Sequence, residues 1–197
     1  MAQLKVPRSE EDFENLKAKV VFNPEEEAYW EEMTKRRRAR VNEDDNRGKI
    51  DFYLNELKKI EGKFGDRIAV KRALIYSIGH VYEWLGTYGM GDSPTEGGDP
   101  RERASMFEQA VFWYQTADET IGYLSDCALR QSEACGGAVH FRKKAGLQED
   151  ETTRAYAERR TELFSAVLGT FSQGTEVFVI KSAPVPESVK KTCKRKS

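Results

Sequence analysis

Between residues 107 and 128, apolar and aromatic side chains recur at intervals of three and four residues. They are Phe107, Ala110, Tyr114, Ala117, Ile121, Leu124 and Ala128. This spacing places them along one side of an α-helix, the side that packs against neighbouring helices. Asp99 and Pro100 precede the pattern as a helix start, and Gly136 and Gly137 follow it as a stop. The sequence therefore predicts one long helix over residues 100–134.

Two shorter stretches have the same spacing. The first contains Ile50, Tyr53, Leu57, Ile60 and Phe64, and the second contains Ile75, Ile78, Tyr82 and Leu85. They predict helices over 50–64 and 66–85, the second of which begins at Asp66 and ends at Gly86. Because several helices with apolar sides can cover one another, the 107–128 pattern indicates one wall of an intramolecular bundle rather than a coiled coil.

Local start signals predict further helices. Residues 9–12 resemble a capping box for a short helix toward Lys19. Asn23 and Pro24 are a cap and a first-turn proline for the next helix, which Gly48 is expected to interrupt or end.

Residues 138–145 are expected to form a short basic helix or turn, and a last long helix is expected after Asp150. The predicted fold is an all-α antiparallel bundle of four to six helices. Its expected organisation is an N-terminal arm at 1–23, a helical bundle domain at 24–181 and a basic flexible tail at 182–197.

Two segments do not fit a helical pattern. Residues 86–100 contain five glycines and two prolines, which predicts a long loop between helices. This loop is either a simple connection or, because it is long for a bundle, a place where something binds. Residues 175–181 are β-branched and aromatic, and they fit either a strand or the last turn of a helix with extended docking.

Composition restricts the cellular setting. The three cysteines, Cys127, Cys135 and Cys193, are odd in number and lack paired spacing, which favours reduced thiols and an intracellular protein. No apolar stretch approaches the length of a membrane span, and residues 1–20 carry too many charges for a signal peptide. We expect a cytoplasmic or nuclear protein with no membrane span, or a virion component if the protein is viral.

The sequence predicts no catalytic residue, no metal site and no cofactor. Its two histidines are His80 and His140, and the order His80-x-x-Glu83 is the reverse of the pair used in di-iron bundles. Residues 89–98 lack the lysine of a phosphate-binding P-loop and are acidic. An alternative stays open, in which His80, Glu83 and the glycine-rich loop form a small-ligand or enzymatic site.

Two basic runs stand out against a net charge of −1. The first contains Lys35, Arg36, Arg37, Arg38 and Arg40, and the second contains Lys190, Lys191, Lys194, Arg195 and Lys196. Clustered cations suit nucleic-acid phosphates or a nuclear-import signal. The competing interpretation of the first run is a solvated helix face whose cations pair with Glu31, Glu32 and the acidic residues 43–45.

Two smaller sets of residues are further candidates. Arg101 and Arg103 fall in the first turn of a predicted helix, where they are either an anion site or solvated charges. The large aromatics Trp30, Trp84, Phe112 and Trp113 exceed what a small core needs, so those left outside would mark a subunit interface.

These features predict a non-enzymatic helical protein that self-associates into a homo-oligomer and contacts RNA or another nucleic acid. A capsid or nucleocapsid subunit is one concrete form of this hypothesis. The alternative is a helical adaptor that binds another protein and carries a nuclear-import tail. A second alternative is a small-ligand-binding or enzymatic helical bundle.

Overall fold

The computed structural model describes residues 4–89 and 98–171, with side chains described as far as Ala166. These residues form seven helices, which confirms the all-α helical bundle and exceeds the four to six helices that the sequence predicts. The helices are α1 (Glu10–Val20), α2 (Pro24–Arg40), α3 (Asn46–Lys59), α4 (Ala69–Tyr88), α5 (Pro100–Ile121), α6 (Asp126–Lys144) and α7 (Glu151–Phe171). The loop residues 90–97 and the segment 175–181, whose structure the sequence left open, lie outside the described residues.

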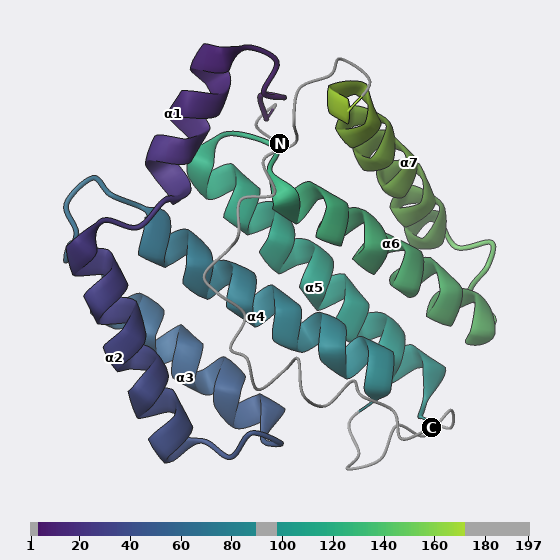
Figure 1. The fold of residues 1–197 in the computed structure, drawn as a ribbon. Coiled ribbons are helices and arrows are strands. Elements are labelled where there is room, and N and C mark those ends of the chain that lie inside the picture. The colour runs from purple at the N-terminus through teal and green to yellow at the C-terminus, as the bar shows by residue number, and fades with distance from the viewer. Residues whose placement is uncertain (1–3, 90–97, 172–197) are drawn as a thin grey trace, which may run out of the picture.

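From α3 to α7 the helices pack in the order of the chain, whereas α1 lies against α4 and α5, and α2 lies against α4. Helices α4, α5, α6 and α7 lie side by side, each against the next, while α3 covers the opposite side of α4 and α2 lies beyond it (Figure 1). The predicted apolar pattern forms the centre of this arrangement, because Phe107, Ala110, Tyr114, Ala117 and Ile121 are all buried. The bundle therefore has its core on α5, between α4 and α6.

The long helix predicted over 100–134 is wrong, because the chain turns at Gly122. This glycine has the left-handed φ of 73° and its N–H closes α5 on the carbonyl of Asp118. Leu124 then pairs its backbone with Lys5, and Ser125 caps the start of α6 by accepting from the N–H of Cys127. Two antiparallel helices thus replace the single one.

The stop predicted at Gly136 and Gly137 is also wrong, because both lie inside α6. A Cβ atom on Gly137 would come 2.5 Å from the ring of Phe107, and one on Gly86 would come 2.8 Å from the same ring. Gly86 likewise does not end α4, which continues to Tyr88. These glycines allow α4 and α6 to approach Phe107 of α5 closely.

Two other predicted boundaries move. Helix α2 ends at Arg40, and Gly48 lies in the first turn of α3, where its N–H donates to the side chain of Asp45. Helix α4 begins at Ala69 without a side-chain cap, so Asp66 does not start it. The short basic segment expected at 138–145 is the last part of α6.

The N-terminal signals are confirmed. Ser9 and Asp12 form a complete capping box for α1, and Asn23 and Glu26 form one for α2, with Pro24 at its first position. Both boxes act through backbone groups three residues apart, so the sequence alone specifies them.

Candidate nucleic-acid interface

Helix α2 is fixed to the bundle at its first turn. Glu26 is fully buried and accepts hydrogen bonds from the N–H of Asn23 and from Arg67, whose Nε lies 2.9 Å away. Trp30 is half-buried and packs on Phe22 with ring centroids 5.5 Å apart. These contacts set the rotation of α2, which decides where the basic run over residues 35–40 points.

Arg36 points inward to a buried carboxylate. Its two terminal nitrogens donate to Glu56 of α3 at 3.0 and 2.8 Å, and the same carboxylate accepts from Tyr29 at 2.8 Å and Lys59 at 2.7 Å. Burial alone raises the pKa of Glu56, but the hydrogen bonds from Arg36, Lys59 and Tyr29 outweigh it and lower the pKa to about 2. Arg36 therefore stabilises the fold and is not free to bind phosphate.

Arg37 is likewise bound within the fold. Its side chain is buried and donates to both carboxylate oxygens of Glu43, at 3.3 and 2.9 Å. The hydrogen bond from Arg37 holds the pKa of Glu43 below its usual value. Glu43 is the member of the acidic run 43–45 that pairs with the basic run, so the competing interpretation of these cations holds for Arg37.

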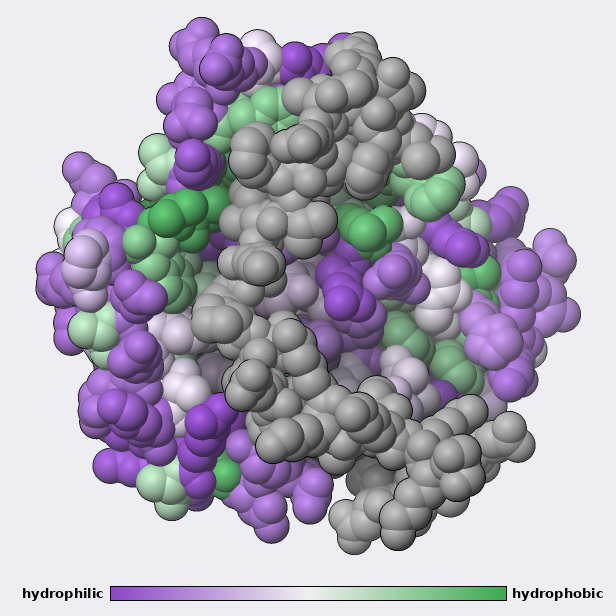
Figure 2. All heavy atoms as spheres, in the orientation of Figure 1, coloured by the Kyte–Doolittle hydropathy of each residue, from purple (hydrophilic) through white to green (hydrophobic). Residues whose placement is uncertain are grey.

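The remaining cations of the run face solvent. Lys35, Arg38 and Arg40 are exposed and form no hydrogen bond or close ion pair within the described residues, although the charge of Arg38 helps to lower the pKa of Glu43. Figure 2 shows mostly hydrophilic residues on the side of the molecule where α2 lies. Helix geometry thus divides the five predicted residues into two structural cations and three surface cations.

The second basic run cannot be placed. Lys190, Lys191, Lys194, Arg195 and Lys196 lie outside the described residues. Their part in an interface stays a sequence prediction.

Of the two arginines predicted as an anion site at the start of α5, one is bound within the fold and the other is exposed. Arg103 donates to the carbonyl oxygens of Gly86 and Thr87, the first at 2.9 Å, and its guanidinium lies 3.9 Å from the ring centre of Phe141. It closes the end of α4 and packs on α6. Arg101 is exposed beside it.

The predicted interface aromatics occupy different environments. Trp84 is 42% exposed and packs on Tyr88, with ring centroids 4.9 Å apart, and Phe112 is 57% exposed. Trp113 is half-buried against Phe112, and its indole N–H is buried with no hydrogen-bond partner among the described residues. Trp84 and Phe112 are therefore the aromatics available to a partner, whereas Trp113 belongs mainly to the core.

His80 and Glu83, the alternative site, lie together on α4. The Nδ1 atom of His80 is 3.8 Å from the Glu83 carboxylate, which also accepts from the hydroxyl of Tyr114 and lies 3.6 Å from Arg130. His80 itself faces solvent and stacks on Tyr76. The tyrosine and the arginine neutralise and orient this carboxylate as part of the α4–α5–α6 packing.

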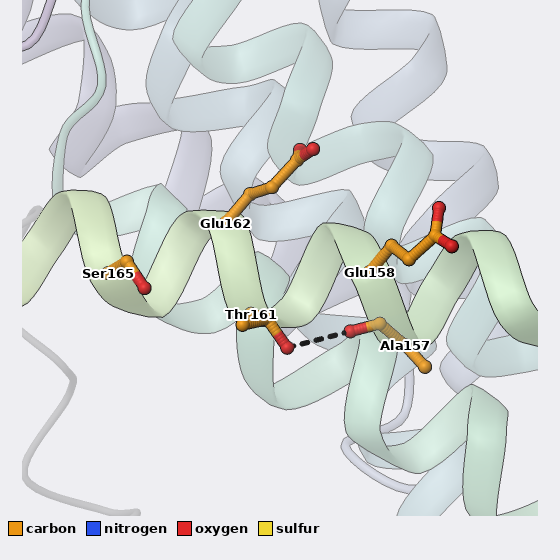
Figure 3. Close-up of a pocket in the computed structure, with 5 residues that line it drawn as sticks. All are labelled: Ala157, Glu158, Thr161, Glu162 and Ser165. Carbon is orange, nitrogen blue, oxygen red and sulfur yellow. Dashed lines mark hydrogen bonds between the residues drawn. The ribbon is translucent and has the colours of Figure 1, made fainter.

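Other surfaces offer little for a reaction. The hollow in Figure 3 is lined by residues that all lie on α7: Ala157, Glu158, Thr161, Glu162 and Ser165. The described residues thus supply one wall of this hollow, and that wall has no histidine or cysteine. Residues 4–89 and 98–171 contain no cluster of His, Cys, Asp or Glu placed to hold a metal ion.

Sequence reasoning missed a polar cluster between α4 and α6. Arg72, Asp118, Ser125, Asp126 and Cys127 meet there, below the turn that joins α5 to α6. Its signal in the sequence is the charge of Arg72 within the most apolar of the described helices.

In the described part of the chain, no helix combines the length and apolarity needed to cross a membrane. No protein-family model, curated protein or solved structure matches the chain, so function is inferred from its own residues.

Proposed function

We propose that this protein is a non-enzymatic helical assembly protein that contacts nucleic acid through the exposed cations of α2 and associates with further copies of itself. The observation that carries the proposal is the exposure of Lys35, Arg38 and Arg40 without ion pairs among the described residues. Cations that are not neutralised by the fold are available to phosphate groups.

Two features of α2 support phosphate contact at this place. The two arginines can each form paired hydrogen bonds with one phosphate, which lysine cannot. Arg36 and Arg37 anchor the same helix turns to Glu56 and Glu43, so the exposed cations project from a rigid backbone. Cations held on a rigid backbone lose less conformational entropy on binding than cations on a flexible one.

The first test measures binding of a labelled single-stranded RNA by fluorescence anisotropy. A variant with Lys35→Gln, Arg38→Gln and Arg40→Gln is compared with a control that carries Lys58→Gln, Lys71→Gln and Lys143→Gln. The control removes three exposed cations from other helices, so both variants have the same net charge.

We expect the α2 variant to bind at least tenfold more weakly at about 50 mM salt, with a log–log salt slope shallower by roughly 2 to 3 units because three phosphate contacts are lost. The control should bind within about twofold of the wild type, since scattered cations do not track a phosphate backbone. Equal weakening by both variants would show that only net charge matters. Full binding by the α2 variant would direct attention to the adaptor alternative, in which α2 meets a protein.

A further inference from the structure

The turn between α5 and α6 holds the N-terminal arm, residues 4–20, in place. The N–H of Lys5 donates to the carbonyl of Gly122 at 3.2 Å, and the N–H of Leu124 donates back to the carbonyl of Lys5 at 2.9 Å. The ammonium of Lys19 donates to the carbonyl of Ile121 at 2.8 Å. The arm therefore takes its main polar contacts from residues 121–124.

The apolar contacts of the arm converge on the same turn. Leu16 and Val20 of α1 pack on Ile121 and Tyr123, and Lys5 and Lys19 both lie over the ring of Tyr123. This cluster of four buried residues is small beside the central core. Ile68, next to the start of α4, packs against the same cluster, so α1 is held between the turn and the start of α4.

Hydrogen bonds from a buried polar cluster hold that turn on its interior side. Asp118 accepts a hydrogen bond from the hydroxyl of Ser125 at 2.5 Å, and the Ser125 oxygen in turn accepts from Arg72 at 2.8 Å. Ser125 also caps α6, and Arg72 donates to the carboxylate of Asp126 and, at 3.1 Å, to the sulfur of Cys127. Ser125 is therefore bonded to α4, α5 and α6 together.

The charges in this cluster balance only when Asp118 carries a proton. The charged groups that face Asp118 are Arg72 from α4 and Asp126 from α6, one of each sign, and burial raises the pKa of the Cys127 thiol, which keeps it neutral. Asp118 is fully buried, and its second oxygen has no hydrogen-bond partner among the described residues. Ionised Asp118 would leave an uncompensated charge in the interior.

We propose that Asp118 acts as a proton-dependent latch, which keeps the N-terminal arm docked while its carboxyl is protonated and releases the arm when the carboxyl ionises. Burial raises the pKa of Asp118 to about 7, against the lowering effects of Ser125 and Arg72, so the change falls within the physiological range. The free-energy cost of the ionised, buried Asp118 falls when Ser125 moves away and water reaches the carboxylate. The carbonyls of residues 121 and 122 then no longer meet Lys19 and Lys5.

The experiment is hydrogen exchange of the full chain, followed by NMR between pH 5 and pH 8. The reporters are the amides of Lys5 and Leu124, expressed as protection factors so that the intrinsic pH dependence of exchange is removed. The amide of Ala110 in the middle of α5 is the internal reference. By proton linkage, protection of the two reporters should fall about tenfold between pH 6 and pH 8 and should stay below that of Ala110, which exchanges only when α5 itself unfolds.

Two variants separate the latch from a general pH effect. Asp118→Asn keeps the shape of the side chain without a titrating proton, and its reporter protection should be constant over the same range. Glu119→Gln removes the exposed carboxyl next to it and should behave as the wild type does. The proposal fails if wild-type protection does not change with pH, or if Asp118→Asn follows the wild-type curve. If Asp118→Asn does not fold, the wild-type profile decides alone.

Discussion

Arg36 and Arg38 lie two positions apart on α2 and have opposite environments. Arg36 completes the hydrogen bonds of a carboxylate that has no exposed surface, whereas Arg38 projects into solvent. The sequence marks both as members of one basic run and contains no local signal that distinguishes them. The difference arises from Glu56, twenty residues further along the chain, which becomes a neighbour only when α3 folds back on α2.

This difference predicts unequal effects on stability. Arg36→Gln should lower the free energy of unfolding by about 2 kcal/mol, because it leaves Glu56 buried with fewer charged donors. Arg38→Gln should change it by no more than about 0.5 kcal/mol, as for other exposed positions. Urea denaturation at neutral pH measures both values. A loss for Arg38→Gln as large as that for Arg36→Gln would contradict the assignment of Arg36 as a structural cation.

The same ion pair has a defined pH dependence. The pKa of Glu56 is about 2 in the folded protein, below its ordinary value of 4.5, so its stabilising contribution is present above pH 4.5 and is lost as the pH falls toward 2. In Arg36→Gln the folded-state pKa is lowered less, so the difference in stability between the two proteins should shrink over that acid range. The denaturation series repeated at pH 3 supplies this check.

At the scale of the helices, the starts of α1 and α2 were predictable, whereas the start of α4 and the ends assigned to glycines were not. A cap and its N–H partners are separated by three residues, so Ser9 and Asn23 could be interpreted from the sequence. A glycine has two structural uses, a left-handed turn or a close approach between helices, and only the tertiary contact decides between them. Gly122 has the first use, whereas Gly86 and Gly137 have the second.

The two adjacent glycines of α6 provide a matched pair for testing this distinction. Gly137→Ala would place a methyl group against the Phe107 ring, and we expect a loss of about 2 kcal/mol and a melting temperature lower by about 6 °C. Gly136→Ala meets only the exposed, flexible side chain of Arg160, at 3.2 Å. Its gain in helix propensity, up to about 1 kcal/mol, should leave the melting temperature unchanged or raised. Thermal unfolding by circular dichroism compares the two variants, and equal destabilisation would exclude close approach as the reason for Gly137.

For the whole molecule, the all-α class followed from the periodicity, because every core helix needs an apolar side wherever its partners lie. The candidate interface could be predicted from the sequence only in part. Composition located the basic run, but which of its cations remain at the surface depends on the rotation of α2, set by Trp30, Glu26 and Arg67. The cluster around Asp118 was not predictable, since its members come from three helices and include no recognised motif.

The proposed self-association concerns surfaces of the assembled bundle. We expect the purified protein to elute above its monomer mass of 22.5 kDa in size-exclusion chromatography with light scattering, with an absorbance ratio at 260 and 280 nm that reports bound nucleic acid. Phe112→Ser should lower the oligomer mass, because exposed aromatics anchor subunit contacts. Phe164→Ser is the control, since Phe164 is 50% exposed on α7, outside the predicted interface. A monomer at every concentration would remove the assembly proposal.

The backbone pairing of Lys5 with Gly122 and Leu124 has a consequence for biosynthesis. Translation proceeds from the N-terminus, so Lys5 leaves the ribosome well before the turn that receives it has been made. At ordinary elongation rates this delay is on the order of 10 s, far longer than a helix needs to form. Throughout that interval, Leu16 and Val20 lack their native contacts with Ile121 and Tyr123. Helix α1 thus docks fully only after α5 has been made, and until then part of its apolar side is open to chaperones in the nascent chain.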